Sequence, residues 1–417
     1  TAWPPTCTMR TRRTRKRRKK NGKRAAVLAA IALSLGALTV WVTRWQPQAD
    51  TASLSTETIN SFAYRTACGL LRSRGENLIY SPVSFYHALS LTASGASGQT
   101  AGELDAYLGV QDGEKPSEQA ASLYRTLHSE GEHSRLTICT SLWHDQSVRL
   151  KRGFKKEATK QYGASVYSAD FGSDAAADIM NEWVQQQTGG TIRPEIRVQE
   201  DDLLRILNTL YFRDEWRDRL YLSETPEPFY LTGGETADAL FLNKTYGSWG
   251  FYKGAGFTRA SLVLKERGQM YFVLPDEGVP VDSFFESAER LQEVMEGGTS
   301  MSGEVVFKIP QFTLSSSLDL KESMVNDGIT DPFVQGDFSN MTKDGEVRIS
   351  AITQDSYISV NRDGVEASSF TDLTLESAAA IEEKADRADM ILNRPFLFGI
   401  KNRGVWLMIG VCDHPAA

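Results

Sequence analysis

The sequence predicts an α+β fold built as one large domain, and three observations lead to this prediction. Apolar residues recur at helical spacing near the start of the folded part, at Ile59, Phe62, Ala63, Ala67, Leu70 and Leu71. Residues 136–143 (Leu-Thr-Ile-Cys-Thr-Ser-Leu-Trp) form a strand-like run instead. No Pro/Gly/Ser-rich linker and no internal repeat occurs after residue 50, so helices and strands are expected to share a single core.

The N-terminal part differs from the rest of the chain. Residues 10–24 contain eleven Lys or Arg and no acid, and residues 25–42 are an apolar run of eighteen. A basic flank before an apolar run favours a cytoplasmic basic end with export of the remaining chain. No small-x-small cleavage site comes after the run, which favours an uncleaved anchor over a removed signal peptide. We therefore expect a basic cytoplasmic tail at 1–24, a transmembrane signal-anchor or signal peptide at 25–42, and a linker at 43–54.

The charge of the remaining chain argues against nucleic acid as a partner. From residue 50 onward there are 34 Lys and Arg against 53 Asp and Glu, a formal charge of −19. Such a domain repels phosphate backbones and anionic membranes, although acidity alone identifies no partner. The basic run at 10–24 could be a nucleic-acid tail, but its apolar neighbour makes a membrane flank the better interpretation. The expected partners therefore include the membrane, through the N-terminal segment, and no nucleic acid.

No sequence feature supports an enzyme. The five His show no metal-ligand spacing, no phosphate-binding Gly-rich loop follows a strand, and a Gly-x-Ser-x-Gly nucleophile motif is missing. Of the cysteines, Cys7 precedes the apolar run, which leaves the odd number of three, Cys68, Cys139 and Cys412, and no disulfide framework. Cys68 and Cys139 are expected to be small buried hydrophobic residues. We therefore expect no enzymatic activity, no cofactor and no metal.

The most informative segment is 360–377. From Val365 every second residue is apolar or small, whereas the intervening residues are polar apart from Phe370. A period of two is typical of a strand with one buried face. The next residues, 377–389, are small and then charged, and contain no tight turn that would return them to a sheet. A strand-competent segment thus leads into an exposed, charged loop.

This combination resembles the reactive-centre loop of the serpins, and motifs elsewhere support the resemblance in the family's order. Residues 81–84 (Ser-Pro-Val-Ser) look like the start of the family's second helix, and residues 208–212 (Asn-Thr-Leu-Tyr-Phe) are similar to its central-strand motif. Further similar motifs lie at 88–90, 95–100, 181–190, 307–312 and 394–398. Each motif alone is common, but the ordered set spans about residues 55–415.

The resemblance implies the fold more fully. It predicts several helices packed around three β-sheets, with a large central sheet and an exposed reactive-centre loop at about 362–392, in a serpin domain over 55–417. With the basic and apolar N-terminal segments, it suggests an exported or membrane-anchored bacterial member.

The resemblance also implies a mechanism, in which the chain is a suicide inhibitor of serine, or less often cysteine, proteases. The protease attacks the loop and forms an acyl-enzyme, and the cut loop then inserts into the central sheet and distorts the protease before deacylation. Insertion requires a strand without Pro, and the sequence has none between 360 and 394. It also requires small or apolar inward residues, a condition met by Val365, Ala367, Ser369, Thr371, Leu373 and Leu375. Phe370 departs from the family's small-residue hinge but faces outward by alternation.

Two counts place the reactive bond differently. Fourteen residues after the hinge glycine Gly364, as in the family, the bond is Ala378–Ala379, which suits elastase-like or some subtilisin-like proteases. Counting back from Arg394 gives Lys384–Ala385 and a trypsin-like target. The first count is preferred because the hinge length fixes how far the protease is pulled. A cut at Lys384 would add six residues, about 20 Å of strand, and give substrate behaviour.

By resemblance, further residues control insertion. The loop hinge comprises Gly364, Val365, Glu366, Ala367, Ser368 and Ser369, with Gly364 as its flexible start. A polar cluster holds the sheet closed until insertion and comprises Ser81, Ser84, Asn208 and Gln354. Gln354 replaces the family's usual His, so hydrogen bonding is retained and a His pH response is lost. Insertion starts at Trp216, Gln311 and Arg362. In the family, the position of Arg362 often holds an acid that pairs, as a clasp, with a Lys at the position of Gln311. Either that clasp is missing here, or Arg362 pairs with an acid near Asp363.

A second functional class shares this scaffold, namely a non-inhibitory serpin-fold module for surface binding or adhesion. The alternation of the loop favours inhibition, whereas Val365, Phe370, Arg362 and the long charged loop favour the binding module. We expect a monomeric inhibitor that forms a covalent complex with a serine protease. It would lie on the extracellular side of the membrane if 25–42 is kept, and be secreted if that segment is cleaved.

Overall fold

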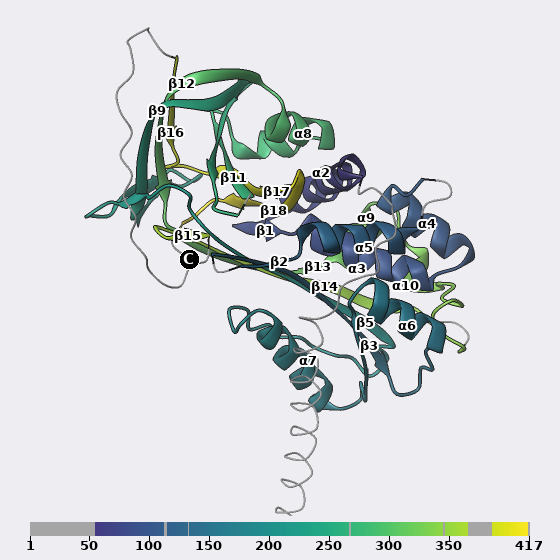
Figure 1. The fold of residues 1–417 in the computed structure, drawn as a ribbon. Helices are drawn as coiled ribbons and strands as arrows, with labels where there is room; N and C mark the ends of the chain where they lie inside the picture. The colour runs from purple at the N-terminus through teal and green to yellow at the C-terminus, as the bar shows by residue number, and fades with distance from the viewer. Residues whose placement is uncertain are drawn as a thin grey trace, which may run out of the picture. The chain divides into compact units, whose positions relative to one another are not determined.

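Two large β-sheets organise the part of the chain that the structure describes (Figure 1). The computed structural model describes residues 55–111, 115–131, 133–266, 268–344, 347–365 and 386–415. These residues all fall in one compact unit, Pro47–Ala417. The other unit, Thr1–Gln46, lies outside the described residues, as do the expected tail, apolar span and linker. Among the helices described, none combines the length and the apolar character needed to cross a bilayer.

The central sheet has seven strands and contains the start of the predicted loop. Its order is β13 (Phe312–Asp319), β14 (Ile349–Asn361), β15 (Gly364–Val365), β5 (Leu204–Glu215), β3 (Ser134–Asp145) and β2 (Ser129–Glu130), and β4 (Ser165–Ala169) also pairs with β3. Strands β14 and β5 run parallel from the Ile349–Leu204 pair to the Asp355–Thr209 pair. Beyond that point β15 lies between them, antiparallel to both.

The second sheet has nine strands, and the last two strands of the described chain lie in its interior. Its order is β1 (Leu78–Tyr80), β18 (Val405–Cys412), β17 (Phe396–Asn402), β11 (Gly268–Pro275), β10 (Phe257–Val263), β9 (Phe241–Gly254), β12 (Thr299–Pro310) and β16 (Asp386–Ile391), with β6 (Tyr221–Leu222) paired with β9. A two-stranded sheet joins β7 (Glu227–Tyr230) and β8 (Thr236–Ala239). The predicted α+β fold with three sheets and a large central sheet is confirmed.

The helices surround these sheets. They are α2 (Thr56–Arg72), α3 (Pro82–Gly95), α4 (Gly98–Leu108), α5 (Pro116–Leu127), α6 (Arg152–Gln161), α7 (Asp174–Gln187), η1 (Val281–Phe285), α8 (Ala288–Glu296), α9 (Leu320–Asn326) and α10 (Asp331–Val334). In α2 the periodic residues Ile59 to Leu71 are buried, as predicted. Figure 1 shows α7 on one face of the central sheet, whereas α3 and α5 lie on the other. The central sheet is therefore covered on both faces.

Helix α3 is buried, and it contacts both the central sheet, at β5 and β3, and strand β18 of the second sheet. Its start depends on local chemistry: the Ser81 side chain caps it by accepting from the Ser84 backbone N–H, and Pro82 occupies the first turn. Cys68 and Cys139 are buried, as predicted.

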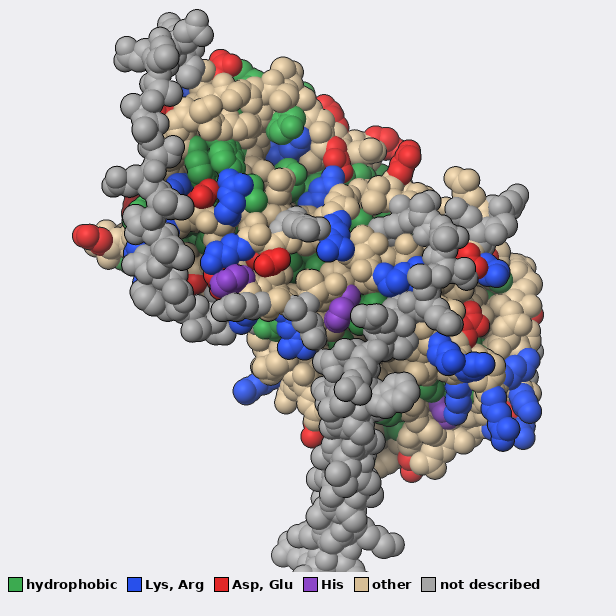
Figure 2. All heavy atoms as spheres, viewed as in Figure 1, with side chains coloured by type: hydrophobic (Ala, Val, Ile, Leu, Met, Phe, Trp, Pro, Cys, Tyr) green, Lys and Arg blue, Asp and Glu red, His purple; other side chains and the backbone are tan. Residues whose placement is uncertain are grey.

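The surface carries both signs of charge. Figure 2 shows Lys and Arg side chains gathered at the edge where α6 lies, and Arg152, Lys155, Lys156 and Lys160 of this helix are exposed. The opposite side of α6 buries Phe154. This basic group is therefore accounted for as the solvated face of an amphipathic helix.

Candidate functional site

The predicted loop hinge begins inside the central sheet. Gly364 and Val365 form β15, which pairs with Asp214 and Glu215 of β5 on one side and with the end of β14 on the other. Val365 is only 1% exposed. Both residues are therefore strand positions paired within the central sheet, whereas the loop was expected to run from about residue 362. The flexibility expected of Gly364 during insertion stays a prediction. The rest of the predicted hinge, Glu366, Ala367, Ser368 and Ser369, lies outside the described residues.

Close packing explains the glycine at position 364. A Cβ atom there would lie 2.4 Å from the Asp214 carbonyl oxygen and 2.7 Å from the Glu215 Cα. Neither contact involves a flexible side chain, so β15 fits beside β5 only because position 364 has no side chain. Gly364 is needed here for proximity to the neighbouring strand.

Asn361, which no predicted motif included as a site residue, shapes the turn that leads into β15. Its Oδ1 accepts hydrogen bonds from the backbone N–H groups of Asp363, at 2.9 Å, and Gly364, at 3.3 Å. Asn side chains often stabilise turns in this way, and an Asp-Gly pair is a common hairpin signal. Asn361-Arg-Asp-Gly364 was thus a readable turn signal.

Trp216 is positioned over this turn. Its ring Nε1 donates to the Asn361 carbonyl at 2.8 Å, its backbone N–H donates to the Asp363 carbonyl at 3.2 Å, and the residue is 5% exposed. The residue assigned to the start of insertion is therefore in direct contact with the hinge turn. Its role in insertion stays a prediction.

The other two residues assigned to this place do not form a clasp. Arg362 Nε lies 3.7 Å from the carboxylate of Asp363, and both side chains are exposed. The Gln311 backbone N–H donates to the Leu240 carbonyl, and no hydrogen bond or ion pair joins Gln311 to Arg362 within the described part of the chain. An exposed pair of adjacent residues contributes little to stability. The clasp is therefore missing among the described residues, and Arg362 makes only this loose, exposed pair with its neighbour Asp363.

The predicted polar cluster comes together beneath the sheet. Gln354 Nε2 donates to the Ser81 carbonyl at 2.9 Å, and its Oε1 accepts from the Ser81 backbone N–H at 2.8 Å. The Ser84 hydroxyl donates to Asn208 Oδ1, and Asn208 Nδ2 donates to Thr140 Oγ1 at 2.7 Å. All five residues are buried, and Gln354 pairs with Asn208 across β14 and β5. The network links α3 to three central strands, while its part in opening the sheet stays a prediction.

His87 is a further member of this network that sequence reasoning missed. Its Nδ1 lies 3.1 Å from Thr140 Oγ1, and the residue is completely buried. Burial lowers the pKa of His87 to about 4, so the ring is neutral at physiological pH. A lone His in an apolar helix gave no signal of this contact in the sequence.

The predicted loop is also shorter at its C-terminal end than expected. The charged residues after 385 were expected in an exposed loop, but residues Asp386–Ile391 form β16, parallel to β12. Ala388 and Met390 are buried, while the charged residues are exposed and Arg387 pairs with Glu304 of β12. The charges are therefore the outward half of a strand. Both candidate reactive bonds, Ala378–Ala379 and Lys384–Ala385, lie outside the described residues.

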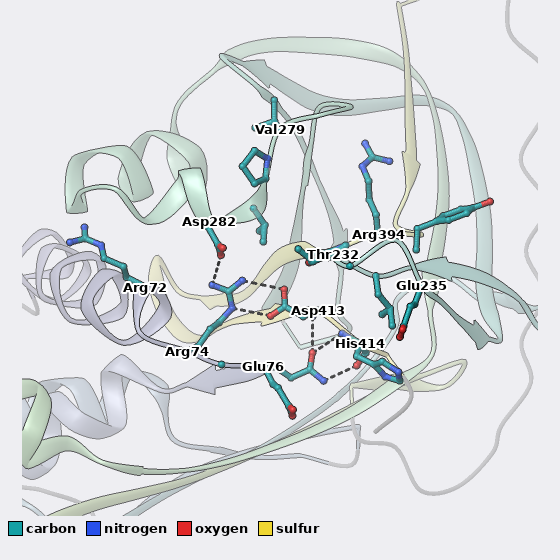
Figure 3. A pocket seen from close by; sticks show the side chains of 18 of the residues that line it. Arg72, Arg74, Glu76, Thr232, Glu235, Val279, Asp282, Arg394, Asp413 and His414 are labelled. Atoms are coloured by element: carbon teal, nitrogen blue, oxygen red, sulfur yellow. Dashed lines mark hydrogen bonds and ion pairs between the residues drawn. The ribbon is translucent and has the colours of Figure 1, made fainter.

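A cavity of about 1100 Å³ near the C-terminal end of α2 is separate from these residues (Figure 3). Arg74 lies in its wall and forms ion pairs with Asp282, at 2.7 Å, and Asp413, at 2.9 Å. None of the hinge or polar-cluster residues lines it. The cavity therefore plays no part in the arrangement around the hinge.

Comparison with known proteins identifies the arrangement. The family model described as Serpin (serine protease inhibitor) matches residues 57–415. Serpin-ZXA of Oryza sativa subsp. japonica is 29% identical over 385 residues, which cover 85% of this chain and 96% of the relative.

Solved structures agree on the fold. The native state of the thermophilic serpin tengpin superposes with a TM-score of 0.76 at 21% identity, covering 89% of this chain and 98% of tengpin. Human thyroxine-binding globulin in complex with thyroxine gives a TM-score of 0.77 at 20% identity, covering 87% of this chain and 99% of the globulin. From the match over nearly the whole described chain, this protein belongs to the serpin family.

Proposed function

We propose that this chain is a suicide-substrate inhibitor of serine proteases that traps the acyl-enzyme by inserting its cleaved loop into the central sheet. The position of β15 supports this proposal most strongly. Gly364 and Val365 already pair with β14 and β5, so the first two positions of the new strand are occupied before any cut. Insertion then extends an existing strand and needs no new nucleus.

The pairing of β15 fixes the register that the cut loop would adopt. Continuing it places Ala367 between Phe212 and Ile358, and Thr371 between Asn208 and Gln354. Opposed residues of antiparallel strands share a face, and these four strand residues are buried. Small or apolar loop residues would therefore enter the α3 face, and Thr371 would enter the polar cluster, where a hydroxyl can form hydrogen bonds.

The same register gives Phe370 a specific environment. It would lie opposite Asp355 and Thr209, which are 3% and 1% exposed, on the face covered by α7. A large ring entering a covered polar site displaces existing contacts. Phe370 would thus slow insertion at that step without blocking the small residues before it.

The position of β16 supports the reactive bond Ala378–Ala379. Proteases bind substrates as extended segments on both sides of the cut bond. At Lys384–Ala385 only Ala385 would separate the bond from Asp386, which already pairs with Gly303 of β12. The bond at Ala378–Ala379 leaves seven residues before β16, so an elastase-like or subtilisin-like target is proposed.

The test is to mix the chain with an elastase-type protease and examine the products on a denaturing gel and by mass spectrometry. We expect a covalent complex that survives denaturation and a released C-terminal fragment that begins at Ala379. Clean cleavage without a complex, and without a gain in the heat resistance of the cut protein, would contradict inhibition.

In that case a serpin-fold binding module is the second candidate. The observation that favours it is the similarity to thyroxine-binding globulin, a protein of this fold whose structure is a complex with thyroxine. The exposed Arg362 in place of the family's acid is consistent with the same alternative.

We also propose that the protein is an exported, membrane-anchored bacterial serpin. The support is the basic run at 10–24 directly before the apolar run at 25–42. The inhibitor would then act as a monomer on the extracellular side of the membrane, or in secreted form if the apolar run is cleaved.

A further inference from the structure

A buried carboxyl group lies directly beside the hinge, and the insertion mechanism makes no use of it. Asp214 of β5 pairs with Val365 of β15 on one side and with Ser134 of β3 on the other, and it is 0% exposed. Its Oδ2 accepts a hydrogen bond from the Glu266 backbone N–H at 3.3 Å, while its Oδ1 has no hydrogen-bond partner among the described residues. One carboxyl oxygen is thus buried without compensation.

The charged groups around Asp214 do not compensate it either. Lys265 Nζ and His133 Nδ1 both bind the carboxylate of the next residue, Glu215, at 2.6 and 3.2 Å, and no ion pair to Asp214 occurs among the described residues. Glu266, from the turn between β10 and β11, has the same sign as Asp214. On the β14 side, Val360 and Val365 are neutral.

Burial therefore controls the protonation of this carboxyl group. It raises the pKa of Asp214 to about 7, although backbone N–H groups of Glu266 and Glu215 favour the charged form. Val365 pairs with Asp214 on the side of β5 that faces β14, opposite to β3. Withdrawal of β15 from this side would admit water to the Asp214 carboxyl group. A solvated Asp ionises near pH 4. The seated hinge consequently holds a proton on Asp214 that the withdrawn hinge would release.

We propose that Asp214 couples the seating of the loop hinge to the binding of one proton, so that acid seats β15 in the central sheet and ionisation of Asp214 drives it out. The inference rests on the proposed function in one respect, since seating is the first step of insertion. The direction is set by linkage. Seating is fully favoured below the pKa of the withdrawn state and is progressively lost as the pH rises toward the pKa of the seated state.

Amide hydrogen exchange of the peptide spanning 360–365 measures seating directly and needs no protease. Exchange rates of the full chain, divided by the intrinsic rate at each pH, give the population of the withdrawn hinge. For the wild type we expect withdrawal to increase with pH by up to tenfold per unit between about 5 and 7, and to level off above about 7. A flat wild-type profile overturns the proposal.

Two variants separate Asp214 from other acids near the hinge. Asp214→Asn keeps the shape and removes the charge, so its profile should be flat at the level of the wild type in acid. Asp363→Asn removes an exposed carboxylate from the turn and should keep the wild-type slope. If Asp214→Asn retains the slope, or Asp363→Asn abolishes it, Asp214 is not the group responsible.

Trapping assays distinguish failure of this inference from failure of the inhibitor function. Each variant is compared with the wild type at one pH, so that the pH dependence of the protease cancels. We expect Asp214→Asn to give more covalent complex per cut than the wild type at pH 8, and a smaller difference between the two at pH 5.5. A complex with no pH-linked exchange leaves the inhibitor function standing and overturns the switch. If exchange depends on pH but no covalent complex forms, the coupling of Asp214 to hinge seating stands and the inhibitor function is overturned.

Discussion

At the residue scale, Gly364 is needed because a side chain at this position would overlap the backbone of the neighbouring strand β5. Gly364 does not have a positive φ, so its backbone conformation does not require glycine. A side chain is excluded at this position only by the short distance to the β5 backbone. Even the smallest substitution should therefore affect how β15 is seated, while the rest of the hinge sequence stays unchanged.

The variant Gly364→Ala tests this contact. The added methyl group would overlap Asp214 and Glu215 backbone atoms, so β15 should be displaced and more of the protein cut without trapping. Overpacking against backbone costs about 1–3 kcal/mol, which corresponds to roughly a 5- to 150-fold rise in the ratio of cleaved protein to complex. The measurement is that ratio with an elastase-type protease.

Gly75→Ala is the matched control, since a Cβ there has no atom within 4 Å. It should partition like the wild type. If Gly364→Ala also does so, then either β15 tolerates the methyl group or seating does not influence trapping.

Some site residues could be located from the sequence because they lie in local motifs. Others could not, because their environment is formed by elements that are distant in sequence. Ser81, Ser84 and Asn208 belong to motifs whose order along the chain is informative, and Gln354 was placed by resemblance at the position of the family's usual His. The structure brings all four together. Asp214 has no such motif. Its neighbours in sequence, Arg-Asp-Glu, suggest an exposed strand end, and its burial depends on β15, β3 and the turn before β11, which are distant in sequence.

At the scale of elements, the polar cluster attaches the buried end of α3 to the central strand β14. Gln354 supplies both bonds to Ser81, the residue that also caps α3. The same side chain thus binds a helix start and a strand that would move apart from β5 in the proposed insertion.

The variant Gln354→Leu should destabilise the uncut protein. It leaves the buried Ser81 N–H without its partner, while the Ser81 carbonyl still accepts from the Phe85 backbone N–H. An unpaired buried donor costs about 1–3 kcal/mol. Urea unfolding of the uncut protein should show that loss of free energy as a lower midpoint.

Thr353→Val provides the comparison on the adjacent position of β14. The Thr353 hydroxyl is buried without a hydrogen-bond partner among the described residues, so its removal should cost less than Gln354→Leu. Equal losses would mean that β14 is sensitive to any substitution, and that the cluster has no special role.

Element boundaries were predicted less well than motifs. The alternation of 365–377 predicted a strand-competent segment, which lies outside the described residues beyond Val365. Strand β16 was missed, because it has only two buried positions, Ala388 and Met390, among charged residues. Its partner β12 lies about eighty residues earlier, so no local turn announces the pairing. The hinge turn at Asn361 was locally readable and was overlooked.

At the scale of the whole molecule, the acidic folded part and the basic N-terminus should act separately. The domain carries a formal charge of −19 from residue 50, so its own attraction to anionic lipid is weak. Membrane attachment should depend on the apolar run at 25–42 alone.

Cell fractionation of the full chain and of a variant lacking residues 25–42 checks this expectation. The full chain should sediment with membranes and resist extraction by high salt, because burial of an apolar span is not screened by ions, whereas the deletion variant should be soluble. Release of the full chain by salt would instead indicate that residues 10–24 attach it electrostatically. The N-terminal sequence of the purified protein shows whether the span is cleaved.

The interior position of the C-terminal strands affects what remains after a cut. Cleavage at Ala378–Ala379 puts β16, β17 and β18 on a separate polypeptide, yet β17 and β18 lie between β11 and β1 in the nine-stranded sheet. The cut protein is therefore a non-covalent assembly of two chains. Its refolding after denaturation becomes a bimolecular reaction that dilution slows, whereas the intact chain folds at a rate independent of concentration. A spent molecule that is unfolded in dilute solution would thus not reassemble.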